Sequence, residues 1–295
     1  MKLLNVAVAV ALGVSILNSA DTLLKPGTVY AENAVNWSQG NDATVTADGY
    51  GAMPAGMPQA QAKMMARRAA ILDAQRNLVS ELKGVQVDAE STMNNYIIQN
   101  DKVQTKVSGL LTGARVNFEG MDSAGGYKVT MAVPMYGVGS VADVAYNAVF
   151  EQKQLSAVPL EVPKPDVSFE KTYTVAATNY TGLIIDAQGL GLEPTFCPAI
   201  FDENGRAIYG VHNVDKDYAI SHGVAEYTND KESALKAASG FSRAGNNPLI
   251  IKATKAKVRI ANACDVVVSV EDGNRILAEN TRSNFMSKYA VVIEK

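Results

Sequence analysis

The sequence predicts an α+β protein of two small mixed α/β domains, each a sheet with helices packed on it, after an N-terminal signal peptide. Three observations support this class. Residues 3–17 form an apolar run after Lys2, several short segments alternate as strands do, and an Ala-rich stretch has helical spacing. We expect four segments: a signal peptide at 1–31, a first domain at 32–152, a proline-containing linker at 153–170 and a second domain at 171–295.

The first seventeen residues indicate export. The apolar run after Lys2 has the length of a signal-peptide core and is shorter than the roughly 20 residues of a spanning helix. Val29 and Ala31 fit the small-residue rule of a leader peptidase, and a cut after Ala20 is the alternative. We therefore expect no stable transmembrane span after cleavage; the alternative is that the segment stays as an uncleaved anchor. A lipid anchor is not expected either, because no cysteine lies near either site and a bacterial lipoprotein needs one directly after the cut.

Residues 59–82 are the clearest predicted helix. Their alanine-rich composition gives high helix propensity. At about 100° per residue, six apolar side chains gather on one side of this helix, and Gly84 follows as a C-terminal cap. The predicted core face consists of Met64, Ile71, Leu72, Leu78, Val79 and Leu82.

The other elements of the first domain follow from alternation and turn residues. Residues 44–46 favour a strand, residues 96–111 and 138–150 favour helices, and residues 114–119 and 127–133 form a predicted hairpin. The linker carries Pro159, Pro163 and Pro165, and such a composition is typical of a stiff, extended segment.

The second domain alternates strands with helices. The predicted strands are 172–175, the central 183–185, the hairpin of 196–201 with 207–209, then 249–253, 266–270 and 289–293. The predicted helices are 231–239 and 271–283. This order indicates a mixed sheet with helices packed on it.

Composition excludes several classes of function. The chain of 295 residues is 47% hydrophobic and 19% charged, which is typical of a packed protein rather than a disordered one. Its net charge of −3 gives no general attraction to nucleic acid. We expect no nucleic-acid partner.

Residues able to do catalysis are sparse. His212 and His222 are the only histidines, and their spacing is not that of a helical metal pair. The glycines at 189 and 191 lack the full dinucleotide-binding pattern, and the acidic turn at 202–205 lacks the remaining ligands of a calcium loop. We expect no enzyme activity, no catalytic residues, no cofactor and no metal site.

Cys197 and Cys264 are the only cysteines. In an oxidising compartment they are a candidate disulfide. The alternative is two small buried thiols that never meet, since the sequence alone cannot supply the short Cα separation that a bridge needs.

Two segments resemble known families. Residues 66–78, preceded by residues 47–51, resemble the outer-membrane lipoprotein family called lipoprotein-twenty and the N-terminal part of flagellar assembly protein T. Residues 180–194 and 247–253 look like the downstream region of exported proteins in the same broad group. The resemblance implies an envelope protein whose Ala-rich helix packs across a small sheet, with no known catalysis.

These inferences combine into one hypothesis about function. We expect an exported, non-enzymatic protein of the periplasm, outer membrane or cell surface that serves as a scaffold or assembly factor, with flagellar association as one form of that role. Its partners would be other envelope proteins or further copies of itself. The alternative is a periplasmic ligand-binding or hydrolytic module that uses the second domain.

Overall fold

The computed structural model describes residues 35–37, 43–156, 158–177, 179–229, 243–258 and 262–295. Val35–Lys295 form one compact unit. The expected signal peptide, its cleavage site and the helix expected at 231–239 lie outside the described residues. Among the residues that the structure describes, no helix is both long enough and apolar enough to cross a membrane.

The N-terminal domain contains an antiparallel three-stranded sheet. Its strands are β1 (Thr44–Gly51), β2 (Arg115–Met121) and β3 (Tyr127–Pro134), with β3 in the centre. The predicted hairpin is confirmed as β2–β3, although a bulge between Val116 and Phe118 shifts its register. On β1 every second residue is buried, so one face of the sheet is covered.

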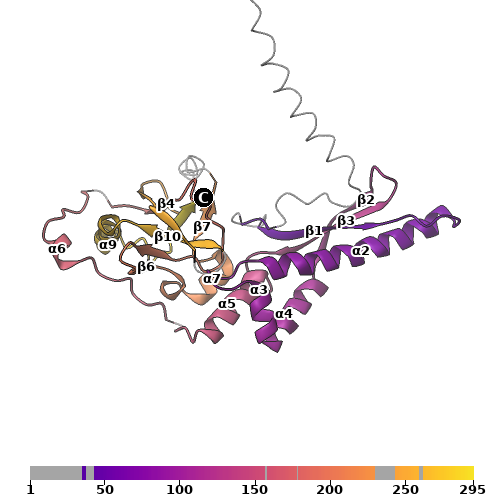
Figure 1. Ribbon diagram of the computed structural model, residues 1–295, viewed down its shortest axis with the longest axis horizontal. Helices are drawn as coiled ribbons and strands as arrows, with labels where there is room; N and C mark the ends of the chain where they lie inside the picture. The colour runs from indigo at the N-terminus through magenta and orange to yellow at the C-terminus, as the bar shows by residue number, and fades with distance from the viewer. Residues whose placement is uncertain (1–34, 38–42, 157, 178, 230–242, 259–261) are drawn as a thin grey trace, which may run out of the picture. The chain divides into compact units, whose positions relative to one another are not determined.

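Helix α2 (Gln59–Gly84) covers that face, and Figure 1 shows it running along the sheet. The predicted core face is confirmed at Leu78 and Leu82, which are buried, and is wrong at Met64 and Leu72, which are 59% and 57% exposed. The reason is the close approach of the helix to β1, which leaves room only for small side chains opposite Gly49 and Gly51. The buried residues of α2 are Ala62, Ala66, Ala70, Ala74, Leu78 and Leu82.

Three further helices complete this domain. They are α3 (Met93–Gln99), α4 (Asp101–Thr112) and α5 (Val141–Gln152). The Asn100 side chain accepts a hydrogen bond from the Lys102 backbone at 2.9 Å, as an N-cap does. Ser140 caps α5 in the same way through Asp143.

The C-terminal domain contains two four-stranded sheets where the sequence predicted one. The first is parallel and consists, in order, of β7 (Glu226–Thr228), β11 (Val291–Glu294), β4 (Gly182–Asp186) and β8 (Pro248–Lys252). The second is mixed and consists, in order, of β6 (Ala207–Tyr209), β5 (Ile200–Asp202), β10 (Ala263–Val268) and β9 (Lys255–Val258). The central position predicted for residues 183–185 is confirmed, because β4 pairs on both sides and is buried.

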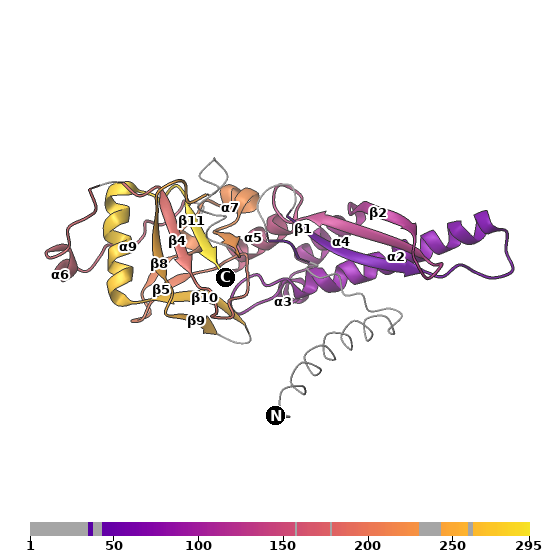
Figure 2. The ribbon, with the colours of Figure 1, turned by 90° about the horizontal axis from the view of Figure 1, so that it is seen from above.

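Among the described residues of this domain, the sheets are accompanied by η1 (Val211–Asn213), α7 (Lys216–His222) and α9 (Val270–Ser283). Figure 2 shows α9 beside the strands. The strand expected at 172–175 is not formed. Instead the Tyr173 hydroxyl and the Ala176 N–H both donate to the Glu279 carboxylate of α9 at 2.8 Å. The Ala176 N–H therefore bonds to a side chain and not to a neighbouring strand.

The two domains share one hydrophobic core. Tyr146 of α5 is fully buried, and its hydroxyl donates to the Phe196 carbonyl at 2.6 Å and accepts from the Val224 N–H at 3.1 Å. The two aromatic rings meet edge to face, with centroids 5.6 Å apart. This contact fixes the segment before β5 against the N-terminal domain.

Candidate binding sites

A cleft of about 520 Å³ lies where residues 88–90 and Lys153 of the N-terminal domain meet the second C-terminal sheet. Its walls come from four parts of the chain that are distant in sequence. The residues lining it are Asp88, Ala89, Glu90, Lys153, Leu160, Glu161, Pro163, Cys197, Ala199, Phe201, Ala207, Tyr209, Gly210, Val211, His212, Asn213 and Asp265.

Backbone hydrogen bonds hold the two sides of this cleft together. The Cys197 N–H donates to the Val87 carbonyl at 2.9 Å, and the Phe196 N–H donates to the Gln86 carbonyl at 3.3 Å. Such bonds satisfy backbone groups that would be costly to bury alone. They place Asp88 beside the segment that leads into β5.

Asp88 is the most strongly engaged charge in the cleft. Its carboxylate lies 2.7 Å from the Lys153 ammonium and accepts hydrogen bonds from the Tyr96 hydroxyl and the Glu90 N–H. Burial alone would raise the pKa of Asp88, but these contacts outweigh burial and hold its pKa below the ordinary value. Asp88 is therefore a bound carboxylate and poorly suited to act as a base.

The proline-containing segment forms one wall of the cleft rather than a free linker. The Leu160 N–H donates to the His212 carbonyl at 2.8 Å, and the Asn213 amide donates to the Leu160 carbonyl at 2.9 Å. We call residues 160–166 the strap. The strap leads into a short helix, α6 (Val167–Glu170).

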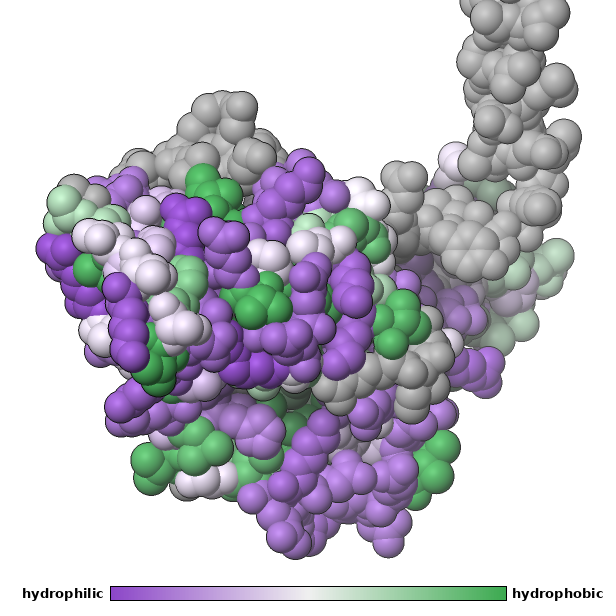
Figure 3. All heavy atoms as spheres, turned by 60° about the vertical axis from the view of Figure 1, so that its left-hand side comes forward, coloured by the Kyte–Doolittle hydropathy of each residue, from purple (hydrophilic) through white to green (hydrophobic). Residues whose placement is uncertain are grey.

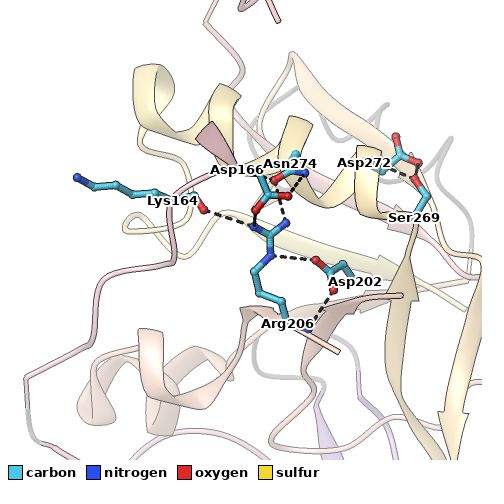
Figure 4. Close-up of polar contacts among 7 residues, drawn as sticks. All are labelled: Lys164, Asp166, Asp202, Arg206, Ser269, Asp272 and Asn274. Atoms are coloured by element: carbon cyan, nitrogen blue, oxygen red, sulfur yellow. Dashed lines mark hydrogen bonds and ion pairs between the residues drawn. The ribbon is translucent and has the colours of Figure 1, made fainter. Parts of the chain in front are cut away.

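Arg206 fastens the far end of the strap, as Figure 4 shows. Its guanidinium lies 2.9 Å from Asp202, 3.0 Å from Asp166 and 2.9 Å from the Asn274 side chain. Asn274 in turn donates to Asp166 at 2.8 Å and accepts from the Asp166 N–H at 2.9 Å. The strap is thus tied to the β5–β6 turn and to α9 through the planar fork of one arginine.

A second recess lies between α2 and α4. It has a volume of about 400 Å³ and is lined by Leu72, Gln75, Arg76, Val79, Leu111 and Thr112. It continues an apolar row on α2, where Met64, Met65 and Leu72 are 59%, 44% and 57% exposed. We call these apolar residues, together with Arg68 and Arg76, the outer face of α2.

The C-terminal domain looks different in the one view that Figure 3 gives of it. Apolar residues occur there as small separate groups among hydrophilic ones. Scattered apolar residues of this kind are ordinary on a protein surface.

Comparison with protein families separates the two domains. Residues 53–133 match the LPP20 lipoprotein family. Residues 182–294 match the second domain of Treponema pallidum Tp0624. Comparison with curated proteins finds no match. The sequence resemblance to lipoprotein-twenty is confirmed for residues 53–133, which include α2, β2 and most of β3 but not β1. The resemblance to flagellar assembly protein T gains no support.

The two cysteines lie in the Tp0624-like region and are both buried. The structure holds both as free thiols, and the candidate disulfide between them stays a prediction. Burial raises the pKa of Cys264 to about 12 and raises that of Cys197 further above its ordinary value. Neither thiol is activated as a nucleophile.

The two histidines occupy different places. His212 lines the cleft, where four carboxylates also lie, but among the described contacts its ring makes none with them. The His222 ring stacks on Tyr218, with centroids 4.6 Å apart. In the described part of the chain, no group of three or more His, Cys, Asp or Glu side chains is arranged to hold a metal ion.

Sequence reasoning missed the cleft itself. Asp88, Lys153 and Asp265 are far apart in sequence, and each has an ordinary local context. The only available signal was the cluster of prolines, which predicted an extended segment but not the surface that this segment covers.

Proposed function

We propose that this chain is an exported, non-enzymatic protein of the cell envelope that serves as a scaffold or assembly factor. Two observations support the location: the apolar run at residues 3–17 after Lys2, and the match of residues 53–133 to a lipoprotein family. The outer face of α2 supports the mode of action, which is binding of another protein.

The single observation that carries the proposal is that α2 has apolar residues on two sides. Its alanine side is buried against the sheet, while Met64, Met65 and Leu72 remain exposed. A helix that needed only to cover the sheet would present polar residues to solvent. An exposed apolar row of this kind is typical of a surface that a partner covers.

The occupant that fits best is an amphipathic helix with acidic residues. The recess is a groove between two helices, and Leu72 and Val79, seven residues apart on α2, place apolar side chains along it. Such a groove suits the apolar face of a bound helix. Arg68 and Arg76 are exposed beside this row and would attract carboxylates at the rim.

The chemistry of the cleft supports a role without catalysis. The Asp88 carboxylate is held by Lys153, and burial keeps the Cys197 thiol, which lines the cleft, protonated at neutral pH. Activated nucleophiles and poised bases have the opposite character.

The test is site-specific photocrosslinking in the native host. A photoreactive residue at position 72 should give one discrete crosslinked product, and Arg76→Glu should weaken it while the melting temperature stays unchanged. A photoreactive residue at Glu203, exposed in the β5–β6 turn, is the matched control. No product at position 72, or the same products at both positions, would overturn the proposal.

A further inference from the structure

We infer that the cleft binds an uncharged small molecule with an apolar body and a single polar end, of the aryl-alcohol or alkyl-alcohol class. This inference goes beyond the proposed scaffold role, because it concerns the cleft and not the outer face of α2. The crosslinking test at position 72 therefore bears on the scaffold role alone.

The cleft has the size of a small-molecule site. Its volume of about 520 Å³ falls inside the range of roughly 300–1,000 Å³ that is typical of ligand pockets. Backbone hydrogen bonds hold the side formed by residues 86–88, and the bonds of Leu160 to His212 and Asn213 hold the strap. The walls are therefore in place before a ligand arrives, which lowers the entropic cost of binding.

Apolar side chains from two parts of the chain form a large part of the walls. They are Phe201 and Ala207 of β5 and β6, Tyr209 of β6, Val211 of η1, and Leu160 and Pro163 of the strap. Leu160 is 57% exposed, so a molecule seated in the cleft would cover apolar surface that now faces water. Removal of apolar surface from water is the main favourable contribution to such binding.

The buried charges of the cleft already have partners. The Asp88 carboxylate lies 2.7 Å from the Lys153 ammonium. Asp265 is 2% exposed, accepts a hydrogen bond from the Ala199 N–H at 3.0 Å and lies opposite Lys257 in the β9–β10 ladder. A charged ligand would lose its water shell here without gaining an unpaired counter-charge, and this loss is costly.

Lys257 also disfavours a cationic ligand beside the aromatic ring. Its ammonium lies 4.0 Å from the centre of the Phe201 ring, so this ring already has a cation against it. A second ammonium at Phe201 would be repelled by the first. The ring therefore offers the cleft apolar surface and not a site for positive charge.

The uncharged polar side chains are engaged as well. The Asn213 amide accepts from the Gly210 N–H at 3.0 Å and donates to the Leu160 carbonyl at 2.9 Å. The Tyr209 hydroxyl donates to the Val224 carbonyl at 3.0 Å. A ligand with many hydroxyl groups, such as a sugar, would leave polar groups unsatisfied against these walls.

The polar end of the ligand belongs at the solvent-exposed side of the cleft. Glu90, His212 and Glu161 line the cleft and are all exposed. Glu90 has an interaction partner of its own, and water screens the charge of an exposed group such as Glu161. A single hydroxyl group can stay hydrated on this side while the apolar body contacts Phe201 and Leu160. An alcohol with an apolar body matches this distribution.

The experiment compares four probes at pH 7. 4-Phenylbutan-1-ol, 4-phenylbutylammonium and 4-phenylbutanoate share one body and differ in charge, and methyl β-glucoside is uncharged but polar. Each is titrated into the ¹⁵N-labelled protein, and amide signals are followed by NMR.

The alcohol should shift the signals of cleft residues such as Ala199, Gly210 and Asn213. It should bind about fivefold or more tightly than either ion, because each ion pays for lost hydration. The glucoside should shift none of these signals. Binding of an ion as tight as that of the alcohol, binding of the glucoside, or no shift at these residues would overturn the inference.

Two matched variants localise the site. Leu160→Asn should weaken binding of 4-phenylbutan-1-ol about threefold or more, because it removes apolar contact area from the strap. Val158→Asn is the control, since Val158 is 72% exposed and lies outside the cleft lining, and it should leave the affinity unchanged. Both variants should keep the parent melting temperature, because both side chains are exposed. Unchanged affinity in Leu160→Asn, or an equal loss in both variants, would reject the cleft as the site.

Discussion

The backbone of Gly49 in β1 packs directly against the backbone of Ala74 in α2. A Cβ placed on Gly49 would lie only 2.1 Å from the Ala74 nitrogen, and one on Gly51 would lie 1.9 Å from the Ala66 carbonyl oxygen. Strand and helix therefore touch through their main chains, and this contact sets the distance between the sheet and the helix that covers it.

Gly49→Ala should accordingly destabilise the protein. The added methyl group has only backbone around it and cannot be accommodated by a side-chain rotation. We expect the free energy of unfolding to fall by about 2 kcal/mol or more, measured by urea denaturation.

Gly109→Ala is the matched control, because nothing lies within 4 Å of its added Cβ on α4. That variant should gain about 0.5–1 kcal/mol from the lower chain entropy of alanine. Equal effects of the two substitutions would contradict the close-packing account.

The two sides of α2 should respond differently to charge. Leu78 is 0% exposed and Leu72 is 57% exposed. Leu78→Asp should unfold the domain, because a buried unpaired carboxylate costs several kcal/mol. Leu72→Asp should change the free energy of unfolding by less than about 0.5 kcal/mol. The comparison is made by thermal melts of both variants, and loss of folding in Leu72→Asp would show that its side chain is buried.

This helix illustrates how far the sequence could lead. Its existence was predicted from alanine propensity, and its packing across a small sheet was implied by the resemblance to the lipoprotein-twenty family. The packed side was predicted only in part, because Leu78 and Leu82 are buried as expected whereas Met64 and Leu72, which the helical period also assigned to the core, are exposed. Only the distance between helix and sheet, which Gly49 and Gly51 set from another element, makes alanine the better fit.

The candidate sites show the same limit more strongly. The hairpins, the central strand β4 and helix α9 follow from local patterns. The cleft depends on Asp88, Lys153 and Asp265, which tertiary structure alone brings together. The division of the C-terminal strands into two sheets could not be predicted either, because the sequence of a short buried strand does not indicate which strand it pairs with.

Arg206 should be required for the docking of the strap. Its Asp202 partner has a side chain that is only 1% exposed, so removal of the guanidinium leaves a buried carboxylate with fewer partners. Arg206→Ala should lower the free energy of unfolding by about 1–3 kcal/mol and speed hydrogen exchange at the Leu160 and Asp166 amides.

Arg206→Lys should recover little of this loss, because an ammonium cannot reproduce the three-way fork. Lys164→Ala, on the exposed part of the strap, is the control and should leave amide exchange unchanged. Equal exchange in Arg206→Ala and the parent protein would show that the arginine does not hold the strap.

Stability should depend on pH in opposite directions at two carboxylates. The pKa of Asp88 is lower in the folded state, so its contribution is present above its unfolded pKa of about 3.9 and is lost as the pH falls through the folded pKa. Burial raises the pKa of Glu226, so its ionisation costs stability as the pH rises from about 4.3 through the raised value.

Urea denaturation between pH 3 and pH 7 checks both signs. Asp88→Asn should lower the free energy of unfolding at neutral pH and reduce its fall at acid pH. Glu226→Gln should remove the decrease in the free energy of unfolding that occurs as the pH rises above about 4.3. Glu203→Gln, at an exposed turn, should reproduce the parent profile. The same sign of change in both variants would contradict the assigned environments.

The thiols should be inert in the folded protein. Burial raises the pKa values of Cys197 and Cys264, so little thiolate exists near pH 8. A thiol reagent should react with both only after denaturation, with rates that follow unfolding. Rapid reaction of the native protein would contradict this burial. Failure to react after denaturation without reductant would reveal a bridge in the exported protein.

The attachment of the strap has a practical consequence for dissecting this molecule. A fragment cut at residue 171 would discard Asp166 and leave Arg206 and Asn274 facing water, together with the apolar surface that Leu160 and Pro163 cover. A fragment meant to contain the C-terminal half alone should begin upstream of Leu160, so that it includes the strap and its prolines, which cover the sheet.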